Sequence, residues 1–327
     1  MIFLLYLILA ICVVFLSVKT ANYVDLLDKK TNLSGAFIGG VMLAAVTSLP
    51  EFFTTISATS FLGNPDLALG NILGSNLFNN TILATLVLLF IKKFGESNIS
   101  KSHLNVSICT LGMYFIICIN LFINIDISIL TISILSIALA IFYAIGVKAM
   151  ANAPSEESDD NEDDSPLTVK QIAVRFVITS ILLIAASIGV TYVSDSIATT
   201  YNLGAGLVGA VLLGIATSLP EVTSCVALMK VGNFNIATGN IVGSTLFNFL
   251  ILTFADLLYI QDTIYIFTDV NTKALLVFGF VAALLLTFMI FLKSRKDEKK
   301  LSNYIYTLPS VGILLCYFAF LIADKFM

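Results

Sequence analysis

The sequence predicts an all-α polytopic membrane protein made of two related halves. Its 327 residues are 58% hydrophobic and only 12% charged, which excludes a soluble domain. Two pairs of matching blocks indicate an internal duplication, because they recur in the same order at nearly the same offset. The first block, Thr-Ser-Leu-Pro-Glu, ends at Glu51 and again at Glu221. The second spans 70–79 and recurs at 239–248.

Ten apolar segments, five in each half, are long enough to cross a bilayer. An odd number of crossings per half means that the second copy enters the membrane from the opposite side. The halves, 1–151 and 167–327, are therefore predicted to be inverted five-helix repeats. Such repeats are typical of secondary transporters, with the ion site at the midplane between discontinuous helices, here expected to be helices 2, 3, 7 and 8. The ten segments lie at 2–24, 33–61, 66–91, 103–123, 126–149, 168–193, 203–229, 235–259, 270–292 and 304–323.

The basic residues predict the orientation in the membrane. If the N-terminus lies outside, every lysine and arginine except Lys273 and Lys325 falls on the inner side, as the positive-inside rule requires. We therefore expect a plasma (inner) membrane protein with both termini outside. The acidic linker 152–166 joins the halves and would be cytoplasmic and disordered. Since it lacks the glycine and distal glutamate of an EF-hand loop, we interpret it as a solvated tether rather than a calcium sensor.

The repeated prolines place polar chemistry inside the membrane. Pro50 and Pro220 lack an N–H and clash with the carbonyl four residues earlier, so a helix break would free carbonyls there. Glu51 and Glu221 lie directly after these prolines. An intramembrane carboxylate costs roughly 2.5–3.5 kcal/mol even on insertion scales, and a symmetric pair indicates a function.

Oxygen groups with helical spacing surround the two glutamates. Histidine and thiol groups are absent from the set, and an all-oxygen site suits Ca²⁺ and Na⁺ rather than zinc or copper. Serine 75 and serine 244 would serve equally well in helix packing. The candidate ligands are Ala44, Thr47, Ser48, Glu51, Ser75 and Asn79 in the first half, and Gly214, Thr217, Ser218, Glu221, Ser244 and Asn248 in the second.

Three other polar residues have simpler interpretations. Asp66 follows Asn64-Pro65 and is expected to cap the third helix. Asp256 lies near the outer interface, where snorkelling or capping is favoured over a role in an outer vestibule. His103, the one histidine, is expected at the inner surface.

The two repeated motifs, Thr-Ser-Leu-Pro-Glu and Gly-Asn-x-x-Gly-Ser-x-x-x-Asn, resemble the α-repeats of the sodium/calcium exchangers, within the calcium/cation antiporter superfamily. The resemblance extends over the whole chain and is nearest to the short prokaryotic exchangers. It implies a calcium site formed by Glu51, Glu221 and the carbonyls of Thr47 and Thr217. It also implies sodium sites that use the four serines and the carbonyls of Ala44 and Gly214, with Asn79 and Asn248 at the centre.

The same resemblance implies a transporter rather than an enzyme, with Ca²⁺ and Na⁺ as substrates and no bound cofactor. It implies no nucleic-acid partner and no obligatory protein partner, only the lipid bilayer. Asn248 resembles the potassium-independent branch, and Ser-Leu-Pro-Glu differs from the Gly-Asn-x-x-Glu of proton-coupled relatives. We therefore expect Na⁺-driven Ca²⁺ extrusion by alternating access. A Ca²⁺/H⁺ antiporter is the nearest alternative, and a cation channel is a more distant one.

Overall fold

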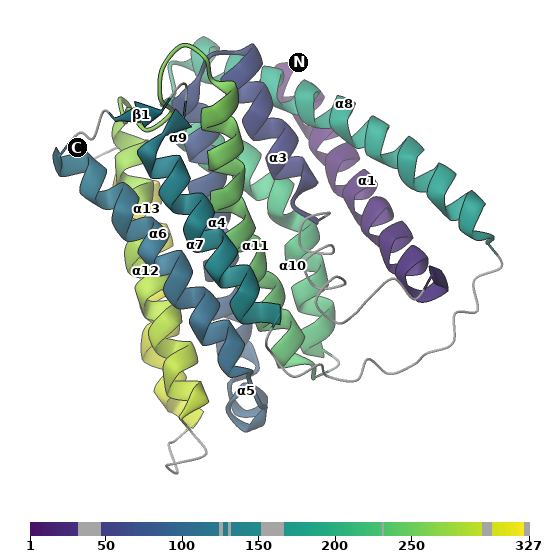
Figure 1. Ribbon diagram of the computed structural model, residues 1–327, viewed down its shortest axis with the longest axis vertical. Coiled ribbons are helices and arrows are strands. Elements are labelled where there is room, and N and C mark those ends of the chain that lie inside the picture. Colours follow the sequence, from purple (N-terminus) through teal and green to yellow (C-terminus); the bar gives the residue numbers. More distant parts are fainter. Residues whose placement is uncertain are drawn as a thin grey trace.

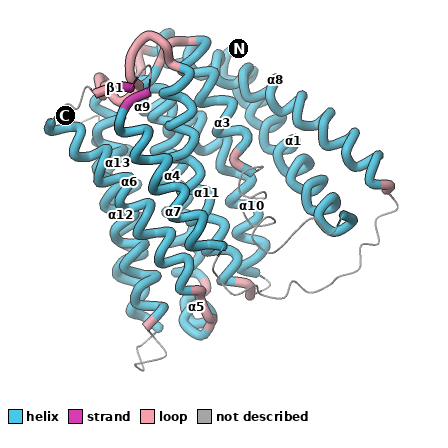
Figure 2. The backbone as a smooth tube through the Cα atoms, in the orientation of Figure 1, coloured by secondary structure: helices cyan, strands magenta, loops and turns pink. Residues whose placement is uncertain are grey.

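The computed structural model describes residues 1–31, 47–123, 127–129, 132–151, 167–230, 232–295 and 303–323. The regular secondary structure within these ranges is helical, apart from one short antiparallel pair of strands, β1 (Ser128–Ile129) and β2 (Ile132–Ser133). In this pair Ser128 lies opposite Ser133. The predicted all-α class is confirmed (Figure 2). The acidic linker and Ala44 lie outside the described residues.

The helices follow the two predicted halves (Figure 1). The first half contains α1 (Ile2–Thr31), α3 (Leu49–Ile56), the π-helix η1 (Ser57–Phe61), α4 (Pro65–Leu89), α5 (Ile91–Glu96), α6 (Lys101–Ile123) and α7 (Ile134–Ala151). The second contains α8 (Val169–Tyr201), α9 (Ala205–Val208), the π-helix η2 (Gly209–Gly214), α10 (Ile215–Lys230), α11 (Phe234–Leu258), α12 (Val270–Ser294), the 3-10 helix η4 (Asn303–Tyr306) and α13 (Thr307–Ala323).

Eight helical segments among the described residues are long and apolar enough to cross a membrane, which makes the chain an integral membrane protein. A ninth apolar helix, Ile134–Met150, is shorter. The predicted segment 33–61 is described only from Thr47 onward, so it does not enter this number.

Contacts between distant segments define two ends of the molecule. At the first, which we call the lysine end, Lys293 Nζ on α12 donates to the carbonyl of Gly95 on α5 at 3.0 Å. At the second, the aspartate end, Asn64 Nδ2 donates to Asp195 Oδ1 at 3.0 Å, and Gly206 N donates to Asp269 Oδ2 at 2.6 Å. Figure 1 shows the N-terminus and the end of α13 at the aspartate end, and α5 at the lysine end.

Two pairs of helices, α1 with α8 and α4 with α11, run in opposite directions between these ends. Helix α1 begins at the aspartate end, where the ring of Phe3 lies 5.2 Å from that of Tyr201. Helix α8 begins at the opposite end (Figure 1). Helix α4 runs from the aspartate end to the lysine end, and α11 runs back. Helices α1 and α8 pack along each other at one side of the remaining bundle.

The prediction that four helices are discontinuous is wrong for three of them. Helices α4 and α11 are unbroken over 25 residues each, because Pro65 occupies the first turn of α4 and α11 contains no proline. The seventh crossing continues through Pro220, since one missing N–H does not end a helix whose neighbouring turns are intact. In the second crossing Ser48 is a turn residue, and Pro50 lies in the first turn of α3, which begins at Leu49.

Two aspartates expected near the outer surface have structural roles. Asn64, not Asp66, caps α4 by accepting from Leu67 N at 3.1 Å, because its side chain precedes the first turn. Asp66 instead accepts from Thr268 Oγ1 and Asp269 N, which joins α4 to the start of α12. Asp256 is fully buried and accepts from Ser136 Oγ at 2.8 Å, so it does not snorkel.

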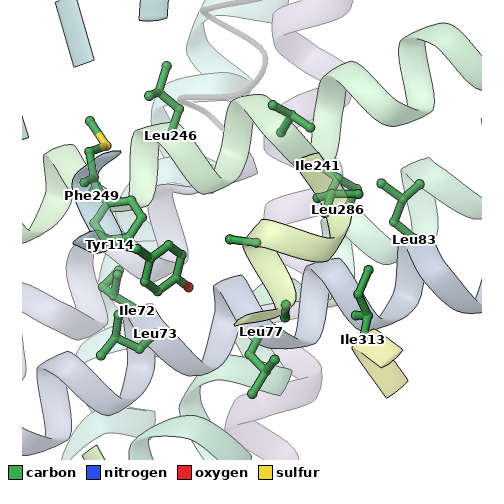
Figure 3. Packing of buried hydrophobic residues seen from close by; sticks show 14 of the residues in the cluster. Ile72, Leu73, Leu77, Leu83, Tyr114, Ile241, Leu246, Phe249, Leu286 and Ile313 are labelled. Carbon is green, nitrogen blue, oxygen red and sulfur yellow. The ribbon is translucent and has the colours of Figure 1, made fainter. Parts of the chain in front are cut away.

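The core surrounds α4. Figure 3 shows Ile72, Leu73 and Leu77 of α4 beside Tyr114 of α6 and Phe249 of α11. The Tyr114 and Phe249 rings meet edge to face, with centroids 4.8 Å apart. Because α4 is enclosed on all sides, any polar group on it must find a partner inside the protein.

Candidate functional site: a paired-glutamate cation site

The two repeated Thr-Ser-Leu-Pro-Glu motifs meet at the centre of the bundle. Glu51 lies in the first turn of α3, and Glu221 lies in α10 directly after Pro220. Their exposed fractions are 1% and 0%. Hydrogen bonds between the two motifs join them although 170 residues separate Glu51 from Glu221 in the chain. The structure therefore brings the two glutamates together, and their role as cation ligands stays a prediction.

The glutamates are paired with serines across the two halves. Ser48 Oγ donates to Glu221 Oε1 at 3.3 Å, and Ser218 Oγ donates to Glu51 Oε1 at 3.1 Å. Each serine thus orients the carboxylate of the opposite motif rather than its own. The second oxygens, Glu51 Oε2 and Glu221 Oε2, are buried and have no hydrogen-bond partner within the described part of the chain.

Helices α4 and α11 carry further buried polar groups. Asn248 Nδ2 donates to Asn76 Oδ1 at 2.8 Å, while Asn248 Oδ1 has no partner among the described residues. Both amide atoms of Asn79 and the hydroxyl of Ser244 are likewise buried without one. Leaving a buried polar group unsatisfied costs about 1–3 kcal/mol, so these groups fit a polar ligand.

Close backbone packing holds Ser75 against the second half. Its hydroxyl donates to the carbonyl of Gly214 at 3.2 Å. A Cβ atom on Gly214 would lie 2.9 Å from Ser75 N, so only glycine permits this approach of α4 to η2. Thr217 Oγ1 in turn donates to Leu213 O at 3.0 Å, which leaves its lone pairs available. Thr47 is 4% exposed.

One residue at this site was not predicted. Asn71 Nδ2 donates to Thr54 Oγ1 at 2.8 Å and to Thr55 Oγ1 at 2.9 Å, and Asn71 Oδ1 accepts from Thr217 Oγ1 at 3.5 Å. It therefore joins α3, α4 and α10. The sequence does carry a signal, because an asparagine stands at the same position, 240, of the repeated block.

The donor set is made of oxygen. Two carboxylates supply the charge, and hydroxyl, amide and carbonyl oxygens supply the remaining ligands. No group of three or more His, Cys, Asp or Glu residues that could hold a metal occurs within the described ranges, so the two glutamates form a site of modest charge. Such a set suits hard cations, Ca²⁺ and Na⁺ among them.

Comparison with known proteins identifies the family of the chain. The family model described as sodium/calcium exchanger protein matches residues 1–148 and 172–324. The chain is 28% identical over 224 residues to the putative antiporter CaxA of Alkalimonas amylolytica, and this alignment covers 68% of the chain and 69% of CaxA. It is 26% identical over 227 residues to the inner membrane protein YrbG of Escherichia coli, which covers 66% of each chain.

Two solved structures share the fold. The H⁺/Ca²⁺ exchanger CAX superposes with a TM-score of 0.70 at 12% identity, over 100% of this chain and 92% of CAX. The sodium-calcium exchanger NCX_Mj superposes with a TM-score of 0.56 at 21% identity, over 97% of this chain and 95% of NCX_Mj. At these identities the likeness concerns the fold alone. The family match spans both halves of the chain, and the protein belongs to the sodium/calcium exchanger family.

Proposed function

We propose that this protein is a secondary active antiporter that exchanges Na⁺ for Ca²⁺ by alternating access. It extrudes Ca²⁺ on the sodium gradient and does not depend on K⁺. Its architecture is ten transmembrane helices in two inverted repeats, residues 1–151 and 167–327. It lies in the plasma (inner) membrane with both termini outside and the acidic segment 152–166 in the cytoplasm.

The crossed serine–glutamate pairing carries this proposal. Glu51 and Glu221 come from different halves, and each keeps one buried oxygen without a hydrogen-bond partner within the described residues. Two carboxylates give a charge near −2, which one Ca²⁺ or two Na⁺ would neutralise. Because both ions need the same two carboxylates, they compete, and this competition couples their transport.

The packing of the helices supports an alternating-access mechanism. The described candidate ligands lie on or directly before α3, on α4, α10 and α11, and at the end of η2, whereas α1 and α8 supply none of them and pack chiefly on each other. A pair of helices attached in this way can slide along the ligand-bearing bundle. Such sliding would expose the same site first to one side of the membrane and then to the other.

Uptake of ⁴⁵Ca²⁺ into sodium-loaded proteoliposomes tests the proposal. We expect uptake that requires an outward sodium gradient, is unaffected by K⁺, and is abolished by Glu51→Gln and by Glu221→Gln. Glu96→Gln is the matched control, because Glu96 is an exposed carboxylate on α5. This variant should transport like the wild type.

The other results would each overturn the proposal in a recognisable way. Uptake driven by a pH gradient and indifferent to sodium would assign the protein to Ca²⁺/H⁺ antiport. Passive uptake without a counter-ion would indicate a channel. Wild-type uptake that persists in both glutamine variants would remove the two glutamates from the transport site.

A further inference from the structure

The second residue of each repeated Gly-Asn block has no part in the ion-binding set described above. These residues are Asn71 on α4 and Asn240 on α11. Both lie one turn before the ligand serine of their helix, Ser75 or Ser244. The two asparagines occupy equivalent positions in the repeats, yet their hydrogen bonding differs in the structure.

Both polar atoms of the Asn71 side chain have hydrogen-bond partners. Asn71 is 0% exposed and donates to Thr54 and Thr55, which are also 0% exposed. Asn71 Nδ2 also lies 3.4 Å from the carbonyl oxygen of Glu51 itself. One side chain thus fixes the helix that carries Glu51 against α4. We call this arrangement the first clamp.

Asn240 makes no such bond. The residue is half-buried, and its Nδ2 atom is buried without a hydrogen-bond partner in the described structure. Ser224, three residues after Glu221 as Thr54 is three after Glu51, is also half-buried. We call the equivalent pair, Asn240 and Ser224, the second clamp, which is open in the sense that Asn240 Nδ2 has no hydrogen-bond partner in the described structure.

The two clamps lie on opposite sides of the ion site. Helix α4 runs from the aspartate end to the lysine end, so Asn71 lies on the aspartate-end side of Ser75. Helix α11 runs the other way, so Asn240 lies on the lysine-end side of Ser244. In this conformation the closed first clamp therefore lies on the aspartate-end side of the ion site, and the open second clamp lies on its lysine-end side.

We propose that Asn71 and Asn240 are positioning residues that act alternately in the transport cycle. In the conformation described here Asn71 closes the first clamp. In the opposite conformation the first clamp opens and Asn240 bonds Ser224, which gives its buried Nδ2 group the partner that it now lacks. This inference rests on the proposed alternating-access function, because a site that served only one face would need no second clamp.

Hydrogen exchange in lipid nanodiscs without Ca²⁺ tests the alternation. In Asn71→Ala we expect amides in 49–61 to exchange roughly tenfold faster, the factor given by losing one or two buried hydrogen bonds. Amides in 219–230 should exchange more slowly, because the second clamp closes more often. Asn240→Ala is the matched control and should leave 49–61 as protected as in the wild type.

A second variant guards against a folding defect in Asn71→Ala. Thr55→Val keeps the shape of the side chain while removing one acceptor of Asn71, and it should produce the same opposite changes in smaller degree. Faster exchange in both segments, or an unchanged 219–230 segment, in a folded variant would overturn the alternation. Asn240→Ala that accelerates exchange in 49–61 as strongly as Asn71→Ala would do the same.

The exchange measurement is separable from the transport assay. If wild-type protein does not exchange Na⁺ for Ca²⁺ but the two segments still respond in opposite directions, the proposed ion coupling is wrong and the clamps stand. If Na⁺/Ca²⁺ exchange is found and the segments respond alike, the transport function stands and the clamps do not.

Discussion

Each site glutamate receives its serine hydrogen bond from the other half of the chain. Ser48 and Ser218 therefore act across the boundary between the halves, and neither half orients its own carboxylate. A hydrogen bond to a charged group contributes about 1.5–3 kcal/mol when both partners are buried. Because the two bonds are alike in length and burial, their loss should have similar effects.

We expect Ser48→Ala and Ser218→Ala each to raise the Ca²⁺ concentration for half-maximal uptake by roughly tenfold or more. The reason is that a carboxylate without its donor is less well oriented toward the ion. Titration of ⁴⁵Ca²⁺ uptake measures the effect. Ser196→Ala is the control, since Ser196 is exposed and its hydroxyl bonds only the Tyr192 carbonyl. A large loss in one serine variant and none in the other would contradict the crossed pairing.

At this scale the sequence indicated that the two glutamates belong together, but it did not indicate which serine bonds which glutamate. The repeated motif identified Glu51 and Glu221 because carboxylates are costly within a membrane. It could not predict that Ser48 bonds Glu221 rather than Glu51, because the pairing depends on how the halves pack. Asn71 was missed for the same reason: its partners, Thr54 and Thr55, lie on another helix.

At the scale of elements, the contact between α4 and the η2 segment sets the position of the site. A Cβ atom on Gly74 would lie 2.4 Å from Ala210 Cα and 2.6 Å from Ala210 Cβ. The two backbones therefore touch at the residue directly before Ser75 on α4 and one turn before Gly214 on η2. Small residues permit such approaches in membrane proteins.

We expect Gly74→Ala to push α4 away from η2, lower the midpoint of thermal unfolding and weaken Ca²⁺ uptake, since overpacking costs about 1–3 kcal/mol. Gly189→Ala on α8 is the matched control. A Cβ there would lie 3.3 Å from the flexible side chain of Leu9, which can move. A thermal unfolding curve of each purified variant provides the comparison. Equal midpoints for the two variants would show that the contact is looser than the structure indicates.

Helix type was the least predictable property of these elements. Prolines in both motifs suggested two equal breaks, but Pro50 lies in the first turn of α3, whereas α10 continues through Pro220. Each half also contains a π-helical turn, η1 or η2, near its motif. The formation of a π-helical turn depends on tertiary packing, and no pattern of residues along the sequence predicts it. Such turns are frequent at functional sites.

At the scale of the whole molecule, charge separates along the axis of the bundle. Lys92, Lys93 and Lys293 lie at the lysine end, and Asp66, Asp195 and Asp269 lie at the other. By the positive-inside rule we expect the lysine end to face the cytoplasm. This asymmetry was visible in the sequence, because it depends only on which loops carry basic residues.

Cysteine labelling checks this orientation. In a variant lacking the five native cysteines, we expect Asp262→Cys to react with a membrane-impermeant maleimide added to intact cells. Lys93→Cys should react only after the membrane is permeabilised, because it lies on α5 at the opposite end. Both side chains are exposed, so a difference in reactivity reports the side of the membrane. The reverse pattern would place the acidic linker outside.

The length of α8 links the protein to the thickness of the surrounding bilayer. Its 33 residues span about 50 Å, while the hydrocarbon core of a bilayer measures about 30 Å. Figure 1 shows α8 strongly inclined to the helices of the bundle, and tilting is one way in which a membrane accommodates a helix longer than its core. If α1 and α8 slide during transport, the thickness of the bilayer becomes part of the free-energy difference between the two conformations. The same chain would then work at different rates in thin and thick membranes.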